Sequence, residues 1–262
     1  MNLYRIYAII LRYSVISFRE LNRLMQITYF PILDIILWGY MGLWMQKSNP
    51  STGILMIYLA AIVLWATVWT IEIELSLNLL EELESRNIVN LASTPLELSE
   101  WLLGNIILGL AKSVFVIFLS SSITYIIFGF NMWHLGIGLL PIILLIICSG
   151  LILGIFLTGI LLWGGQQIAV LTWSIPYLIL TFSAPFYSVE LLPVCLQYIV
   201  KLLPTTHIFE SLRELIRTEM LPQKTILISL VLNVMYLTAA LIFCFRMFNR
   251  SKTRGLAQLE QE

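Results

Sequence analysis

The sequence predicts an all-α, polytopic membrane protein with six transmembrane helices. Of its 262 residues, 59% are hydrophobic and only 11% are charged, and the mean hydropathy is +0.91. Soluble domains carry about 25% charged residues, so this composition suits a bilayer as its solvent. Apolar stretches of about 20 residues, the length that crosses about 30 Å of hydrocarbon, recur along the chain. Basic and acidic residues are equal in number, 15 of each, which argues against a nucleic-acid partner.

Residues 1–25 are predicted to form an amphipathic helix. At 100° per residue its four arginines, Arg5, Arg12, Arg19 and Arg23, fall within one narrow arc. Apolar side chains occupy the opposite side: Leu3, Tyr7, Ile10, Phe18, Leu21 and Met25. Such a helix is suited to lying on an anionic leaflet, and the alternative is that it packs on other helices of the protein. The arginines and the lack of a small-residue cleavage site argue against a secretory signal peptide.

Six segments are long and apolar enough to cross the membrane, at about 27–45, 53–73, 98–128, 135–162, 168–187 and 225–246. An even number of spans puts both termini on one side. That side holds nine lysines and arginines, in the N-terminal helix, the insert after the second span and the tail, whereas the other side holds five. The positive-inside rule therefore predicts that both termini and the insert are cytoplasmic.

The polar insert at 81–100 divides into two pieces. Thr94, Pro95 and Glu97 fit a capping box with the threonine as N-cap, so the third long helix is predicted to begin at Pro95. At 1.5 Å per residue that helix would be about 50 Å long and would extend out of the bilayer. The second span likewise continues toward residue 80. A short crosswise helix at about 83–93 is therefore expected between two helical stalks.

The external segment at 188–224 is too long for a simple turn. It contains two stretches with helical apolar periodicity, separated near Pro204. Because proline cannot continue a helix without losing a hydrogen bond, we predict two short helices, at about 190–202 and 206–218. Each is too short and too charged to cross the membrane, so we expect both to lie at the outer leaflet or to dip into it.

The sequence contains no signature of an enzyme. It has no GxxxxGK[ST] loop to hold phosphates and no HExxH zinc motif, and His134 and His207 are isolated. Neither a disulfide framework nor a zinc site is predicted from the three widely spaced cysteines, Cys148, Cys195 and Cys244. The nearest approach to an acidic cluster is the pair Glu72 and Glu74, which we expect to be solvated on the second stalk.

Two charged residues fall well inside predicted spans, away from their ends: Asp34 in the first and Lys112 in the third. A charge in lipid is costly unless it faces a partner or water, and the two lie at similar depths from the cytoplasmic face. The sequence therefore predicts an Asp34–Lys112 ion pair. Aromatic residues of the spans are interfacial anchors, core residues or the lining of a cavity for an amphiphilic substrate. The candidates for such a substrate path are Trp38, Trp65, Tyr177 and Phe182.

These features together resemble the permease subunit of type-2 ATP-binding-cassette (ABC) exporters. The insert and the helix after it read NLLEELESRNIVNLASTPLELSEWLLG, and they match the pattern of that family at Glu84, Leu91, Ser93, Pro95, Glu100 and Gly104. Thr94 departs from the pattern because it stands between the serine and the proline. The stretch LLPTTHIFESLRELIR before the last span matches a second pattern of the family at Pro204, Phe209 and Arg213.

The resemblance implies roles for these segments. The chain, 1–262, would be a single permease domain that consists of the segments 1–25, 27–80, 81–94, 95–187, 188–224, 225–247 and 248–262. In the family, the insert carries a coupling helix, here about 83–93, that seats in a groove of a separate cytoplasmic ABC ATPase. The coupling residues implied are Glu81, Glu82, Glu84, Arg86, Asn87 and Asn90. Their acidic run suggests a basic rim on the ATPase, and Pro204, Phe209 and Arg213 would belong to an external gate.

The resemblance also implies partners and a substrate class. Two ATPase copies would bind ATP and magnesium, so this chain would bind no cofactor and would not be an enzyme by itself. A second permease copy would complete a homodimer in contact with membrane lipid, and the substrate would pass between the first, second and fifth spans. The cargo would be a lipid-linked glycan, a lipid or a drug, exported across the plasma (inner) membrane. The alternatives are a membrane-embedded lipid-modifying enzyme and a non-transport scaffold or passive channel.

Overall fold

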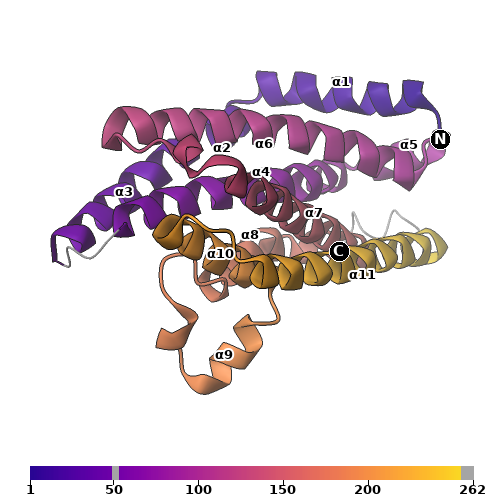
Figure 1. Ribbon diagram of the computed structural model, residues 1–262. Coiled ribbons are helices and arrows are strands. Elements are labelled where there is room, and N and C mark those ends of the chain that lie inside the picture. The colour runs from indigo at the N-terminus through magenta and orange to yellow at the C-terminus, as the bar shows by residue number, and fades with distance from the viewer. Residues whose placement is uncertain (49–52, 255–262) are drawn as a thin grey trace.

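A computed structural model describes residues 1–48 and 53–254, and within these ranges it contains helices and no strands (Figure 1). In chain order the α-helices are α1 (Leu3–Arg19), α2 (Leu21–Ile27), α3 (Tyr29–Ser48), α4 (Ile54–Glu84), α5 (Ile88–Ser93), α6 (Leu98–Phe128), α7 (Leu139–Gly164), α8 (Val170–Phe182), α9 (Val194–Val200), α10 (Pro204–Thr218) and α11 (Gln223–Arg254). Short 3₁₀ helices are η1 (Met132–Gly138), η2 (Gly165–Ile168) and η3 (Val189–Leu191). The predicted tail, 248–262, continues α11 as far as Arg254, and its residues 255–262 lie outside the described residues.

Five helical segments of the described chain are long and apolar enough to cross a membrane: Leu21–Ser48, Ile54–Glu84, Leu98–Phe128, Met132–Ile168 and Gln223–Thr253. The remaining predicted span, 168–187, contains the shorter apolar helix α8. Its 13 residues make about 20 Å of helix, less than the roughly 30 Å of a bilayer core. The chain is therefore an all-α polytopic membrane protein. Within its predicted fifth span, 168–187, the α-helix is α8 alone, and the remainder after Phe182 is a loop.

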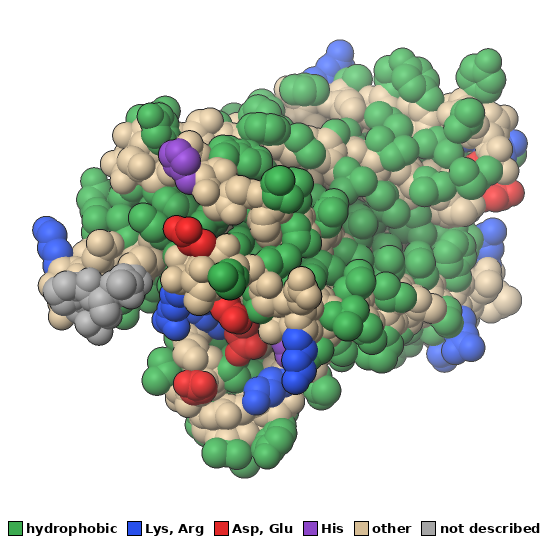
Figure 2. Space-filling model, in the orientation of Figure 1, with side chains coloured by type: hydrophobic (Ala, Val, Ile, Leu, Met, Phe, Trp, Pro, Cys, Tyr) green, Lys and Arg blue, Asp and Glu red, His purple; other side chains and the backbone are tan. Residues whose placement is uncertain are grey.

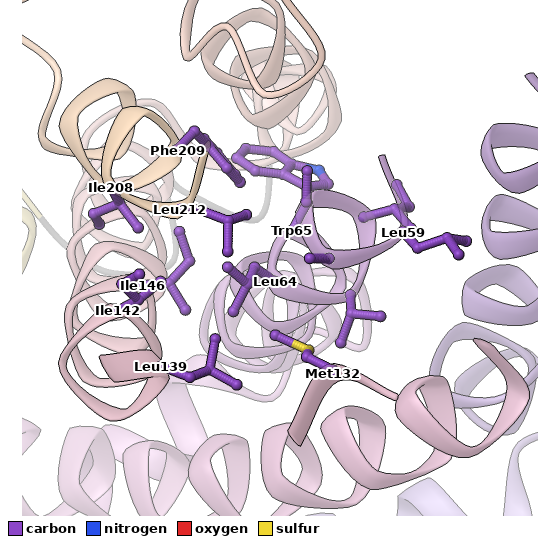
Figure 3. Close-up of a cluster of buried hydrophobic side chains, with 14 of the residues drawn as sticks. Leu59, Leu64, Trp65, Met132, Leu139, Ile142, Ile146, Ile208, Phe209 and Leu212 are labelled. Atoms are coloured by element: carbon purple, nitrogen blue, oxygen red, sulfur yellow. The ribbon is translucent and has the colours of Figure 1, made fainter. Parts of the chain in front are cut away.

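Helix α4 lies at the centre of the bundle because almost its whole circumference is apolar. Its middle turns are fully buried, and they pack against α3, α6 and α7. Close approach of α7 depends on Gly154, where an added Cβ would lie 3.1 Å from Leu75 Cβ and 3.2 Å from Glu72 Cα. Figure 3 shows side chains of α10, including Phe209 and Leu212, directed into the same apolar cluster as residues of α4 and α7. The core thus joins helix α10 to the long apolar helices α4 and α7.

The bundle has two polar ends separated by an apolar band. Figure 1 shows the start of α1, helix α5 and the end of α11 together at one end, whereas α10 and the end of α3 lie toward the other. In Figure 2 hydrophobic side chains cover the middle of the molecule, and most charged side chains on that face lie near the two ends. The N-terminus, the insert and the end of α11 therefore lie at the same end of the bundle.

Helix α1 runs alongside the first half of α6 in the same direction. Its buried side chains Ile6, Ile9, Tyr13 and Ser17 face α6, and Ile9 sits over Gly104, where a Cβ would lie 2.6 Å from Ile9 Cγ2. The opposite, apolar face remains exposed, with side chains such as Leu3, Tyr7 and Phe18. Packing against the protein therefore describes the inward face of this helix. Its apolar face and the side chains of Arg12 and Arg19 stay exposed, so contact of the same helix with a leaflet stays a prediction.

The connection between α4 and α6 differs from the prediction at both of its helix boundaries. Helix α4 continues to Glu84, so the short crosswise helix is only α5. Helix α6 begins at Leu98 with Glu97 as N-cap, in a capping box in which Glu97 and Glu100 each accept from the other's backbone N–H. Thr94 lies three residues before the N-cap of α6. Its hydroxyl donates to the carbonyl of Leu91 at the end of α5 and accepts from the backbone N–H of Leu96. The two glutamates form the reciprocal pair because each carboxylate reaches a free N–H of the first turn.

Candidate functional site: a groove with an aromatic wall and a charged end

A groove of about 1,510 Å³ runs along one side of α4. Its walls come from α1, α2 and α3 on one side and from α8 and the loop after it on the other, and α4 forms its floor. The lining residues of α4 extend from Ile62 to Glu84, a distance of about 33 Å along a helix. The groove therefore extends over a length comparable to the apolar thickness of a bilayer.

One part of the groove has an aromatic wall. Trp38 of α3 stacks on Phe186 of the loop after α8, with ring centroids 4.1 Å apart and planes 14° apart. On α4, Trp69 lies 6.0 Å from Trp173 and 5.1 Å from Tyr177 between ring centroids, and these two belong to α8. Aromatic side chains from α3, α4, α8 and the loop after α8 thus line one groove, which suits a ligand with a large apolar body.

The structure brings together three of the four residues predicted for the substrate path. Trp38, Trp65 and Tyr177 all line the groove. Phe182 does not line it and packs instead on the small cluster around Ala184 near η3. Sequence reasoning left out Trp69, Trp173 and Phe186, because an apolar segment without clear periodicity does not indicate which way its side chains point.

A buried ion cluster lies beside the opposite end of the groove, and two of its members, Arg23 and Glu81, line the groove itself. Lys112 of α6 forms an ion pair with Glu74 of α4, and its ammonium also donates to the hydroxyl of Ser17, 2.6 Å away. Arg23 of α2 lies 3.7 Å from the same Glu74 carboxylate. It also pairs with Glu81, which lies two turns further along α4. The side chains of Arg23 and Glu74 are each 3% exposed. Two glutamates of α4 therefore balance two cations that come from α2 and α6.

This cluster corrects two predictions about charged residues. The predicted Asp34–Lys112 pair is wrong, because Lys112 is engaged by Glu74 and, within 1–48 and 53–254, no ion pair includes Asp34. Glu72 and Glu74 are buried rather than solvated on a stalk, since α6 and α7 cover that part of α4. Glu72 is 0% exposed and accepts from the Ser76 hydroxyl at 2.7 Å.

A second cluster fastens α1 to the end of α4. The Glu82 carboxylate lies 2.7 Å from Arg12 Nη2 and accepts from the Tyr13 hydroxyl at 2.8 Å. The indole of Trp101 on α6 donates to the same tyrosine oxygen at 3.0 Å. Burial and the neighbouring Glu82 carboxylate raise the pKa of Tyr13 well above its ordinary value, so the phenol stays a donor. Near the start of α1, Arg5 lies 3.4 Å from the buried carboxylate of Glu100 on α6.

The structure divides the residues implied for coupling into two groups. Glu81 and Glu82 are engaged by the arginines of α2 and α1, and Asn87 donates to Glu82 at 2.6 Å. Glu84, Arg86 and Asn90 are exposed at the turn before α5 or on it. Arg86 has a φ of 53°, which places it in the left-handed region at the sharp turn from α4 into α5. Of the residues implied for coupling, Glu84, Arg86 and Asn90 are therefore the exposed ones, which another protein could contact.

The residues implied for an external gate are buried at the other end. Pro204 is the first residue of α10, and Phe209 lies in the core with 0% exposure. Arg213 donates to the carbonyls of Ala184 and Pro185, at 2.6 and 3.4 Å. Ala184 has a φ of 50°, so this arginine holds a sharply reversed loop against α10. Burial lowers the pKa of Arg213 from its ordinary value.

The remaining candidate ligands form no metal site within the described residues. No three histidine, cysteine or acidic side chains come together there in a way that could hold a metal ion, and the three cysteines are free. His207 bonds to the carbonyl of Lys201 at 2.8 Å and lies 4.0 Å from Glu210. His134 is exposed on η1.

The described chain is an all-helical membrane bundle with a long groove along α4. The family model of the ABC-2 type transporter matches residues 7–216, and the chain belongs to that family. No curated protein matches the chain significantly. Family membership identifies a multi-pass membrane component that works with an ATP-binding subunit and is not an enzyme by itself.

Proposed function

We propose that this chain is the membrane half of an ABC exporter. It moves a hydrophobic or amphiphilic substrate, such as a lipid-linked glycan, a lipid or a drug, out of the cytoplasm or the inner leaflet. The observation that carries the proposal is the groove, whose lining changes from charged side chains beside α1 and α2 to aromatic ones beside α8. An amphiphile can keep a polar end and an apolar body in contact with matching surfaces along such a groove.

Energy comes from a separate cytoplasmic ATPase that carries ATP and magnesium, since the chain has no loop of its own for a nucleotide. Two ATPase copies serve the two permease copies. Each docks on α5 of one permease and on the turn before it, where Glu84, Arg86 and Asn90 are exposed. Glu81 and Glu82 are engaged by arginines of the same chain, so Glu84 is the acidic side chain of that run that meets a basic rim on the ATPase. Helix α4 continues directly into this turn and transmits its movement to the groove floor.

The assembly is a homodimer in the plasma (inner) membrane with both termini in the cytoplasm. Exposed apolar side chains on α3 and α11, including Leu37, Tyr40, Leu227 and Val231, need lipid or a second copy to cover them. The orientation is supported by the basic residues of the N-terminal helix, the insert and the end of α11, which gather on one side of the bundle.

The test is copurification of the chain with its cognate ATPase, followed by measurement of ATP hydrolysis in membranes. A Glu84→Lys change should lower transport-coupled hydrolysis at least about tenfold, because it replaces an exposed anion at the docking surface by a cation. Glu214→Lys is the matched control, since Glu214 is exposed on α10 at the other end of the molecule. We expect that control to hydrolyse ATP as the wild type does. Full coupling in the Glu84 variant, or equal loss in both variants, would contradict docking at α5.

A further inference from the structure

We propose that the groove selects lipophilic cations and that Asp34 is the counter-charge that recognises them. This inference rests on the proposed transport function and names the substrate class for the same groove. Asp34 is the only aspartate in the sequence and lies within the candidate span Leu21–Ser48. Ionisable residues at such positions are costly in lipid and ordinarily face a partner or water.

Asp34 is placed so that its carboxylate borders the aromatic wall. It lines the groove together with Pro31 and Trp38, which lie three residues before it and four residues after it on α3. Residues at these spacings share one face of a helix. The residue is exposed to the groove, and Trp38 carries the stacked ring of Phe186 beside it. A ligand that contacts this face therefore meets a carboxylate and π-faces together.

The protein supplies no cation for Asp34 within 1–48 and 53–254. The two basic side chains on the groove wall are Arg12 and Arg23. Arg12 is engaged by Glu82, and Arg23 by Glu81 and Glu74. Lys112, which the sequence predicted as the partner of Asp34, is paired with Glu74 instead. The described chain thus leaves Asp34 without a positive charge, and we assign that charge to the ligand.

The groove as a whole disfavours anions. Five acidic side chains and two basic ones line it, an excess of three negative charges: Glu20, Asp34, Glu81, Glu82 and Glu84 against Arg12 and Arg23. An anionic headgroup such as a pyrophosphate would find both guanidiniums already paired. A bulky cation gains from the carboxylate and from the quadrupoles of the aromatic rings, which attract positive charge over their faces. The charge balance thus separates cationic from anionic amphiphiles.

The experiment measures binding of radiolabelled tetraphenylphosphonium to the permease in lipid nanodiscs with its ATPase and without nucleotide, by equilibrium dialysis with empty discs subtracted. Wild type should show saturable binding. Neutral triphenylphosphine oxide, which has similar rings without the charge, should displace the label at least about tenfold less effectively than unlabelled cation, because it forms no charge pair.

Three variants locate the effect in the chain. Asp34→Asn should weaken binding of the cation at least about tenfold and leave displacement by the neutral analogue unchanged, whereas Asp34→Glu should restore most of the affinity. Tyr177→Leu, at a side chain that is 59% exposed, should weaken both ligands a few-fold through lost ring contact. Glu214→Gln removes the same charge away from the groove and should change neither. Monodisperse elution of each variant with the ATPase shows that folding is intact.

A second arm distinguishes a soluble cation from a lipid with a cationic headgroup. Discs that contain dioleoyl-trimethylammonium-propane compete with the phosphonium if the natural ligand is a lipid, and do not compete if it is soluble; both results support recognition of a cation. No saturable binding in wild type, equal binding of cation and neutral analogue, or unchanged affinity in Asp34→Asn would overturn the inference. Coupling through α5 is measured separately, so a negative binding result would leave the transport proposal standing. Conversely, a failure of the coupling experiment would not affect the conclusion drawn from the binding of the cation.

Discussion

The ion pair between Glu74 and Lys112 should be measurable as a coupling energy in a double-mutant cycle. Glu74→Leu removes the carboxylate that serves Lys112 and Arg23, and leaves Lys112 only the hydroxyl of Ser17. Loss of one partner from a buried pair costs about 3–5 kcal/mol, because the remaining charge is left uncompensated. Lys112→Leu should cost less, about 2 kcal/mol, since Glu74 keeps Arg23 at 3.7 Å and accepts from Asn78 at 3.0 Å.

The double variant should cost less than the sum of the two single variants by about 2–3 kcal/mol. The measurement is the free energy of unfolding in mixed micelles titrated with SDS, followed by loss of helical circular dichroism. As a control for the pair that the sequence alone suggested, Asp34→Leu and Lys112→Leu should combine additively to within about 0.5 kcal/mol. Additivity at 74 and 112, or strong coupling at 34 and 112, would refute the ion network described for α2, α4 and α6.

Three further changes test other contacts of the fold, each by the same unfolding measurement unless stated otherwise. Gly154→Ala should cost about 1–3 kcal/mol because its Cβ would push α7 off α4, whereas Gly109→Ala, whose Cβ meets its neighbours at 3.6 Å or more, should be nearly neutral; similar costs at both sites would contradict the close packing. Tyr13→Phe should cost about 1–2 kcal/mol and speed amide hydrogen exchange in α1, because its hydroxyl joins a carboxylate of α4 to an indole of α6; unchanged exchange would disprove that link. Arg213→Lys should cost about 1–3 kcal/mol and expose the loop at Ala184 to protease, and a protected loop would show that one amine suffices.

Much of the architecture follows from the order of residues alone. A span must be apolar over about 20 residues whatever surrounds it, so hydropathy locates it without knowledge of its neighbours. The break near Pro204 and the amphipathic character of residues 1–25 are likewise local, because they depend on the missing N–H of proline and on the helical period. The structure has α10 beginning at Pro204 and α1 with one buried face.

The site could be predicted only in part, because its composition shows in the sequence and its arrangement does not. Trp38, Trp65 and Tyr177 were candidates because they are aromatic residues of apolar segments, and they do line the groove. Phe182 has the same character but points into another cluster, and Trp69 completes the wall without any distinguishing signal. Direction is decided by which neighbouring helix covers each face of a uniformly apolar segment.

The sequence by itself determined that this chain is a helical membrane protein with a polar insert after its second span, since solvation by lipid constrains every residue of a span directly. Tertiary structure alone decided which charges meet. Depth in the membrane made Asp34 and Lys112 look like partners, but the rotation of each helix turns Lys112 to Glu74 and leaves Asp34 on the groove. It also decided that Thr94 closes α5 while Glu97 caps α6, because several side chains near a helix start could cap it and geometry selects one. A pairing depends on two positions in space at once, and a sequence records the position of neither.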